Sequence, residues 1–242
     1  MRSALCLFGI VGGVKGKNGK GVPVDFAMCH ESYKKHVIDI NNTDVFIHSW
    51  STEFEKPLVE LYSPKKYEFE EQKKFIYRQG EQEENVHRQT RRWYSTKRVL
   101  ELKADYEKEN NFKYDWVMVG RFDLMFFIDI LFNKLESGKF YVPKWNQTYW
   151  QSKKVPQLRV PNRIDQSLVK KKLQDLFFIA NSNMMDTFSG IYEAQTNHPH
   201  HPHMRLWCYL MNNMNLGDKV ERILYRWYDY ELYRWKVCHC YH

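Results

Sequence analysis

An acidic residue follows one of the most apolar runs of the sequence. Residues 116–119 read Trp-Val-Met-Val, and Gly120, Arg121, Phe122 and Asp123 come directly after them. A carboxylate in this position must reach a cleft, a cationic partner or a metal ion, because an isolated buried charge is too costly. Arg121 and Asp123 alternate to the same side of an extended chain. Two interpretations therefore stay open: an Arg121–Asp123 ion pair, or a carboxylate at Asp123 that binds a divalent ion bridging phosphate oxygens.

A second candidate is the glycine- and lysine-rich segment that follows the first apolar run. Residues 4–11 are apolar, and residues 12–21 then contain Gly12, Gly13 and Lys15 with further glycines and lysines. Glycine backbone amides can approach a diphosphate closely, and lysine side chains neutralise its charge. The spacing matches neither the phosphate-loop pattern nor the dinucleotide fingerprint. A phosphate-binding loop and a plain surface loop are both compatible with this segment.

Strands and helices must alternate along the chain to position these residues. The apolar patterns predict strands over residues 4–11, 44–50, 116–119, 140–143 and 176–180, and helices over residues 28–41, 85–110, 183–195 and 204–213. This order predicts an α/β fold, with a mostly parallel central sheet flanked by helices, in a single domain over residues 1–242. In open sheets of this kind, ligands bind beyond the carboxyl ends of the strands. Residues 56–84 are polar, contain Pro57 and Pro64, and predict a mobile or surface segment.

Composition restricts the compartment and the partners. The chain of 242 residues is 43% hydrophobic and 16% aromatic, enough to bury one large core. Its five cysteines are scattered and odd in number, which argues against a disulfide framework and predicts a reducing, cytoplasmic compartment. No apolar run approaches the roughly 18 residues of a membrane span, and the first apolar run is interpreted as a strand. The net charge of +8 is compatible with nucleic acid, an anionic surface or a phosphate-bearing substrate, and equally with a well-solvated surface.

Residues 112–124, which read FKYDWVMVGRFDL, resemble glycosyltransferases of the A-type fold, especially those encoded by large DNA viruses of algae. Further similarities are DVFIHSW at residues 44–50, RIDQ at 163–166 and FIANS at 178–182. The likeness extends over residues 4–215. It implies a Rossmann-like nucleotide-sugar half at about residues 1–125, an acceptor half at about 126–242, a UDP- or GDP-sugar donor and a glycan hydroxyl as acceptor. A viral member would act in the host cytoplasm.

The resemblance also implies Mn²⁺ or Mg²⁺ bound by an Asp-x-Asp motif after a central strand. Only the last carboxylate, Asp123, is present here, because Arg121 occupies the first position. A metal at Asp123 would need a further ligand. His198, His200, His201 or His203 could serve, with His201 as the first candidate, since some retaining members use a C-terminal histidine. An exposed, uninvolved loop is the alternative. For an inverting reaction, Asp165 is the candidate base, with a helix-capping aspartate as the alternative.

Two other functions remain open. A glycine-containing loop after a first strand also suits an S-adenosylmethionine-dependent methyltransferase, although His48, Ser49 and Trp50 stand where an acidic residue would close the second strand. A basic nucleic-acid-binding protein would use the Arg-, Tyr- and Trp-rich residues 222–236 to stack on bases. A helix that packs its rings on the sheet explains these residues equally well. We expect no nucleic-acid partner, and no zinc site at Cys238, His239 and Cys240, whose adjacent positions cannot surround one ion.

Overall fold

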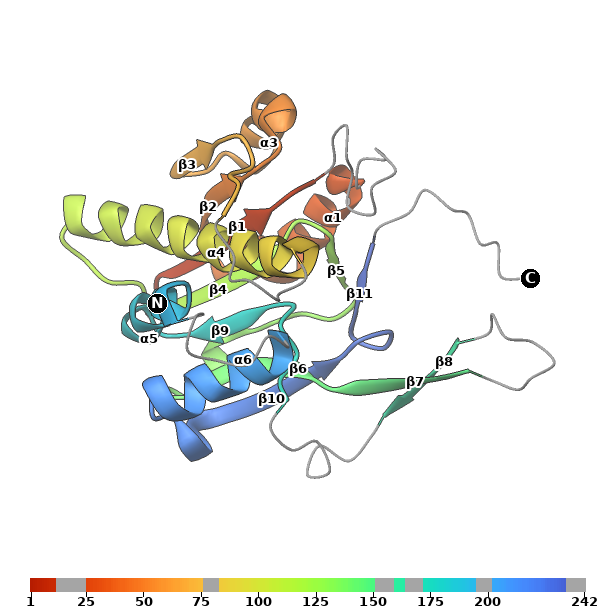
Figure 1. Ribbon diagram of the computed structural model, residues 1–242. Coiled ribbons are helices and arrows are strands. Elements are labelled where there is room, and N and C mark those ends of the chain that lie inside the picture. Colours follow the sequence, from red (N-terminus) through yellow and green to blue (C-terminus); the bar gives the residue numbers. More distant parts are fainter. Residues whose placement is uncertain (12–24, 76–82, 151–158, 164–171, 195–201, 234–242) are drawn as a thin grey trace.

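The computed structural model describes residues 1–11, 25–75, 83–150, 159–163, 172–194 and 202–233. Its centre is a seven-stranded sheet with the order β10-β6-β9-β4-β1-β2-β3 (Figure 1). The strands are β1 (Ser3–Gly9), β2 (Thr43–Ser49), β3 (Lys66–Phe69), β4 (Trp116–Arg121), β6 (Phe140–Lys144), β9 (Phe178–Ala180) and β10 (Val220–Tyr225).

Most neighbours in this sheet are parallel. β1 pairs in parallel with β2 and β4, β2 with β3, and β6 with β10. β9 lies between β4 and β6 and runs antiparallel to both. The mostly parallel α/β sheet predicted from the sequence is therefore confirmed, and the carboxyl ends of its six other strands share one edge.

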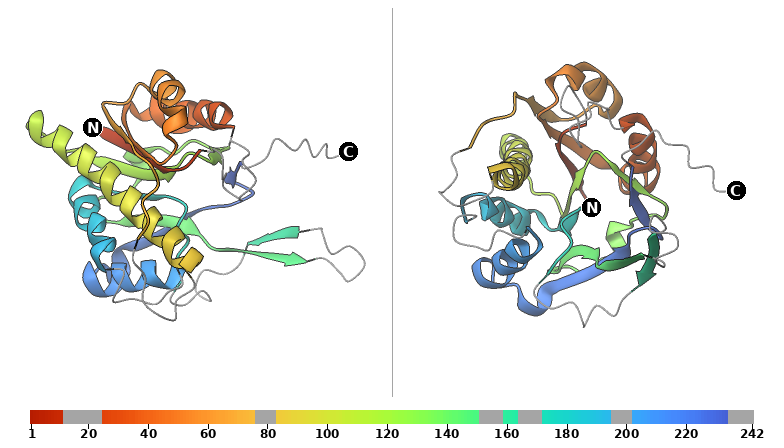
Figure 2. Two further views of the ribbon diagram at one scale, coloured as in Figure 1. Left: turned by 45° about the horizontal axis from the view of Figure 1, so that its top comes forward. Right: turned by 45° about the vertical axis from the view of Figure 1, so that its right-hand side comes forward.

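Helices cover both faces of the sheet, as the two views in Figure 2 show. One face carries α1 (Phe26–Tyr33), which continues through a π-helical turn (Lys34–Ile38) into α2 (Asp39–Asn41), and α3 (Glu55–Tyr62). The other face carries α4 (Glu83–Glu109), α5 (Ser182–Phe188) and α6 (Pro202–Cys208). No helix of the described residues is long and apolar enough to cross a membrane.

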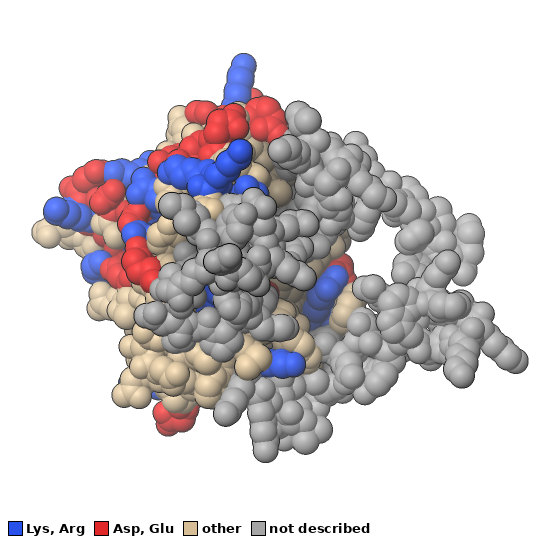
Figure 3. Space-filling model, in the orientation of Figure 1, with Lys and Arg blue, Asp and Glu red and all other residues tan. Residues whose placement is uncertain are grey.

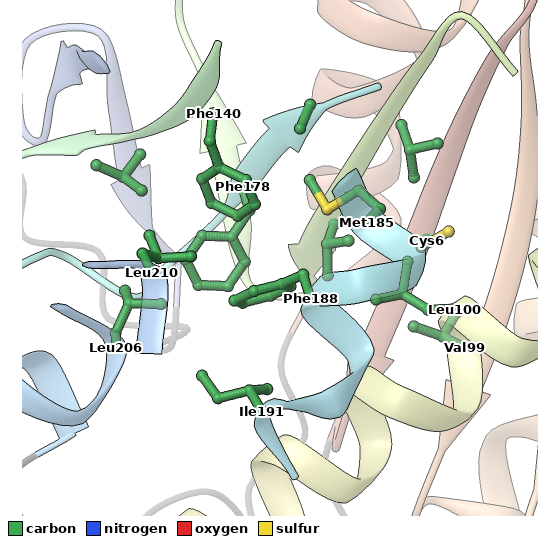
Figure 4. Close-up of a cluster of buried hydrophobic side chains, with 14 of the residues drawn as sticks. Cys6, Val99, Leu100, Phe140, Phe178, Met185, Phe188, Ile191, Leu206 and Leu210 are labelled. Carbon is green, nitrogen blue, oxygen red and sulfur yellow. The ribbon is translucent and has the colours of Figure 1, made fainter. Parts of the chain in front are cut away.

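Alternate residues of each central strand supply the two cores. Ala4, Cys6 and Phe8 of β1 face α4, α5 and α6, where the buried cluster includes Phe178 and Phe188 (Figure 4). The intervening β1 residues Leu5 and Leu7 pack on the other side, against α1 and α3. Burial on both faces explains why β1 is a continuous apolar run instead of an alternating one.

Two smaller antiparallel sheets complete the fold. β5 (Leu124–Phe126) pairs with β11 (Tyr230–Leu232) directly after the candidate site. β7 (Asn146–Trp150) pairs with β8 (Arg159–Arg163) in a ribbon that projects away from the central sheet.

Two segments contain regular structure that the sequence patterns did not predict. The polar segment 56–84 was expected to be mobile or at the surface; its described residues contribute to α3, and β3 adds to the sheet edge beside β2. Leu58 and Tyr62 of α3 are buried and Leu61 packs against the same core, so the apolar face of this helix anchors it to the sheet. The helical alternative for the C-terminal tail is wrong within residues 220–232, which form β10 and β11 because β6 and β5 offer them unpaired edges.

Candidate active site

The order of the central strands creates a switch point between β1 and β4. The chain proceeds from β1 outward through β2 to β3, and β4 then joins β1 on its other side. In open α/β sheets, such a change in the direction of strand order is the usual place of a ligand site. The next described element after β1 is α1, and it packs against β5, which follows β4. Phe8 of β1 and Arg121 of β4 are register partners at this edge.

Arg121 and Asp123 form a bidentate ion pair at the end of β4. Arg121 donates from Nε to Asp123 Oδ1 (2.8 Å) and from Nη2 to Asp123 Oδ2 (2.9 Å). The Asp123 side chain is fully buried, and that of Arg121 is 14% exposed. Burial by itself would lower the pKa of Arg121, but its attraction to Asp123 outweighs burial and raises this pKa. The structure thus forms the ion pair that the alternation of the two residues allowed.

The backbone around this pair is also held in place. The Tyr33 hydroxyl of α1 donates to the Arg121 carbonyl (2.9 Å), and the Tyr233 amide after β11 donates to the Asp123 carbonyl (2.8 Å). A Cβ atom on Gly120 would lie 2.5 Å from the Tyr33 hydroxyl. Glycine at position 120 is therefore required for Tyr33 to approach β4 and fix the start of the Arg121–Asp123 turn.

Arg92 of α4 lies over the end of β1. Its Cζ is 5.3 Å from the centroid of the Phe8 ring, and its Nη1 lies 3.0 Å from Asp175 Oδ2. Its other two nitrogens, Nε and Nη2, are buried and have no hydrogen-bond partner among the described residues. Burial lowers the pKa of Arg92 to about 10 despite the opposing charge of Asp175, so the guanidinium stays protonated at neutral pH.

Asp175, just before β9, connects Arg92 with His203 of α6. Burial by itself would raise the pKa of Asp175, but its neighbours, above all the positive charge of Arg92, outweigh burial and lower the pKa. His203 Nδ1 lies 3.6 Å from Asp175 Oδ1 and bonds to the carbonyl of Leu173 (2.8 Å). A carbonyl only accepts, so Nδ1 carries the proton in this bond.

A hydrogen-bonded relay fixes the carboxyl end of β1. Ser95 of α4 accepts from the Gly9 amide (3.1 Å) and is 2.6 Å from His48 Nδ1, while His48 Nε2 lies 3.1 Å from Glu70 Oε1. Burial lowers the pKa of His48, although the neighbouring carboxylate of Glu70 opposes this shift. Gly9 has a φ of 109°, a conformation that favours glycine. The relay joins the ends of β1, β2 and β3 to α4.

Five sequence-predicted site residues lie outside the described part of the chain. They are Gly12, Gly13, Lys15, Asp165 and His201. Among the predicted residues, the structure brings together Arg121 and Asp123. Of the histidines in the segment 198–203, His203 is described, and it lies beside Asp175.

Sequence reasoning missed Arg92 and Asp175. Arg92 is one of several basic residues in α4, so the presence of an arginine at this position does not by itself indicate a functional site. Asp175 precedes a strand, as Asp165 does on the sequence-based interpretation, but nothing in the sequence relates it to position 92. The signal that was available is the neighbouring Trp93, whose burial in the core orients this turn of α4 toward the sheet.

The predicted Mn²⁺ or Mg²⁺ does not fit the donor set around Asp123. Both oxygens of this carboxylate accept hydrogen bonds from Arg121, and its side chain is fully buried. Within the described ranges, no group of three or more His, Cys, Asp and Glu side chains is arranged to hold a metal ion. A divalent ion at Asp123 would have to displace a guanidinium that is itself buried.

A surface hollow lies at the opposite edge of the sheet. Met1, Lys113, Asp115 and Asn183 are among the residues that line it, next to the amino end of β4. It is separated from Arg121 by the whole length of the strand and does not belong to the switch point.

No protein-family model matches the chain, and no curated protein matches it significantly.

Proposed function

We propose that this protein is a glycosyltransferase that moves a sugar from a UDP- or GDP-sugar to a hydroxyl group of a glycan. The observation that carries the proposal is the buried Arg121–Asp123 pair at the switch point of a mostly parallel sheet. In the resembling glycosyltransferases, the motif after the central strand is the one expected to meet the donor diphosphate, and Arg121 and Asp123 stand at that place in the sequence. Arg92 adds a second buried cation to the same edge.

The proposed reaction is a displacement at the anomeric carbon of the donor. The acceptor oxygen forms a bond to this carbon, and the bond from the carbon to the phosphate oxygen breaks, so its electron pair leaves with the nucleoside diphosphate. Cationic side chains fixed in a buried site stabilise the charge that develops on the leaving group. For an inverting reaction, a base takes the proton of the acceptor hydroxyl, and Asp165 remains the candidate.

Arg121 and Asp123 have different tasks in this proposal. Arg121 uses Nε and Nη2 to bind Asp123, so Nη1 is not engaged by this carboxylate. Asp123 fixes the plane of the guanidinium and keeps it charged. Since Mn²⁺ or Mg²⁺ does not fit Asp123 while this pair is formed, no step of the proposed reaction is assigned to a metal.

The surface formed by the described residues does not single out a nucleic-acid partner. On the face shown in Figure 3, basic and acidic side chains are interspersed over α3, β3 and α4. Arg98, for example, pairs with Glu68 and Glu101 there. Where the described residues form this face, the basic side chains are accompanied by carboxylates and make no continuous basic stripe.

Ligand-dependent thermal stabilisation tests the proposal. UDP-sugars, GDP-sugars, S-adenosylmethionine and single-stranded oligonucleotides are each added, with and without Mn²⁺. A ligand at about 100 times its Kd stabilises by about 2.7 kcal/mol, which raises the Tm of a chain of this size by roughly 5–11 °C. We expect a nucleotide sugar to cause this rise.

Two variants localise the effect. Asp123→Asn keeps the shape of the side chain but removes the charge that orients Arg121, and should abolish most of the rise. Asp218→Asn makes the same change at an exposed position and should leave it intact. Stabilisation by oligonucleotide or S-adenosylmethionine, with none by any nucleotide sugar, would show that the proposed function is wrong.

A further inference from the structure

We infer that Arg92 and Arg121 bind the donor diphosphate in place of a divalent ion. This inference rests on the proposed function and adds to it the chemical groups that recognise the donor. The expected metal motif would offer the carboxylate of Asp123 to a divalent ion, but both oxygens of this carboxylate bind Arg121.

The carboxylate of Asp123 binds the guanidinium of Arg121. Each of its oxygens accepts one hydrogen bond from Arg121, in the fork-to-fork arrangement that suits guanidinium and carboxylate groups. A charged pair that is removed from water in this way is costly to separate, because either partner alone would be a buried, uncompensated charge. The first position of the expected Asp-x-Asp motif thus supplies a cation, and the last position holds that cation in place.

Arg92 has hydrogen-bonding groups that the described residues leave unused. One nitrogen meets Asp175, while Nε and Nη2 are buried without a partner among the described residues. Buried polar groups in folded proteins are almost always hydrogen-bonded, so each exception calls for a partner such as a ligand or water. The planar guanidinium fork matches the geometry of phosphate oxygens, which it can bind in a bidentate manner.

The two arginines lie close enough for their charges to interact. Arg92 lies over Phe8, and Phe8 and Arg121 are register partners on adjacent strands. Arg121 and Asp123 both affect the pKa of Arg92, and Asp175 is affected by both arginines.

Asp175 and His203 are positioning residues in this arrangement. Asp175 binds one side of the Arg92 guanidinium and leaves the other nitrogens for a ligand. His203 in turn lies beside Asp175 and is held by the carbonyl of Leu173. The segments that contribute are α4, the end of β4, the residues before β9 and the start of α6, so the cationic site depends on the complete fold.

The experiment measures the binding of UDP and GDP by calorimetry, in EDTA and again with Mn²⁺. We expect the better of the two nucleotides to bind with similar affinity in both conditions. Arg92→Met should weaken this binding about 10- to 100-fold, as expected for the loss of charge-assisted hydrogen bonds. Arg92→Lys keeps the charge but loses the planar fork, and should weaken binding less than Arg92→Met.

Controls separate a contact with the diphosphate from a general disturbance of the fold. Arg98→Met removes an arginine from the same helix, where it pairs with surface carboxylates, and should leave nucleotide affinity unchanged. The effect of the Arg92 variants should shrink for the corresponding nucleoside, which has no phosphate. If Arg92→Met does not fold, Arg92→Lys provides the comparison.

The outcomes distinguish this inference from the proposed function. Nucleotide binding that requires Mn²⁺, or that is indifferent to both Arg92 variants, would overturn the inference and leave the glycosyltransferase proposal in place. An equal loss for nucleotide and nucleoside would also overturn it, because the role of Arg92 would then be structural. The absence of binding by any nucleotide or nucleotide sugar, with and without Mn²⁺, would overturn the proposed function itself.

Discussion

Replacing Lys103 by methionine tests the energetics of a buried ion cluster that joins α4, α5 and the segment before β4. The Lys103 side chain is fully buried, and its Nζ donates to Glu107 Oε2 (3.0 Å), Ser182 Oγ (2.6 Å) and Asp186 Oδ1 (2.5 Å). Burial by itself would raise the pKa of Glu107, but its hydrogen bonds and the charge of Lys103 outweigh burial and lower the pKa. Lys103→Met leaves this carboxylate without its buried cation.

Lys113→Met provides a matched control within the same cluster. Lys113 contacts the same two carboxylates, Glu107 Oε2 at 2.9 Å and Asp186 Oδ2 at 2.7 Å, but its side chain is 52% exposed. Breaking a buried pair costs about 3–5 kcal/mol, and Lys103→Met should fall at the lower end because Lys113 remains near Glu107. An exposed pair contributes about 0–1 kcal/mol, so Lys113→Met should cost no more than that.

Urea unfolding followed by far-UV circular dichroism measures both losses, and thermal unfolding provides a second readout. For a chain of this size, the lower estimate for Lys103→Met corresponds to a drop in Tm of about 6–12 °C, against at most about 4 °C for Lys113→Met. Equal losses in the two variants would refute the reasoning, because burial would then not control the strength of these ion pairs. A loss below about 1 kcal/mol for Lys103→Met would refute it as well.

Two further predictions concern β4 and acid sensitivity. Gly120→Ala should destabilise the protein by about 1–3 kcal/mol, because the added methyl group would clash with the Tyr33 hydroxyl. In a double-mutant cycle, Tyr33→Phe should recover part of this loss. Additive losses from the two substitutions would show that the clash is not the cause. Burial lowers the pKa of His48 and of His30 in the folded protein, so the unfolded chain takes up protons first as the pH falls below 6.5. The free energy of unfolding should therefore decrease from that pH downward, until the folded histidines also protonate. His48→Gln should flatten this dependence in urea unfolding at a series of pH values, and an unchanged slope would exclude His48 as its source.

The central strands of the sheet could be predicted because each one forms a short, continuous apolar run in the sequence. β1 and β4 are buried on both faces, and such strands appear in the sequence as continuous apolar runs. The helical pattern around Trp93 and Val99 likewise predicted α4, since both side chains face one core. β3 and β10 were not predicted because edge strands are only partly buried, and their pairing depends on partners that are distant in the sequence.

The amino-acid sequence alone predicts the α/β class, the strand end at which Arg121 and Asp123 lie, and their position on one side of the chain. These properties follow from apolar periodicity and from the alternation of side chains along a strand. The folded chain was needed to show that Asp123 binds Arg121 with both oxygens, and that Arg92 and Asp175 lie at the same edge of the sheet. Desolvation and charge neutralisation act between residues that sheet order and helix packing bring together. No local sequence pattern specifies which distant charged residues will share a buried site.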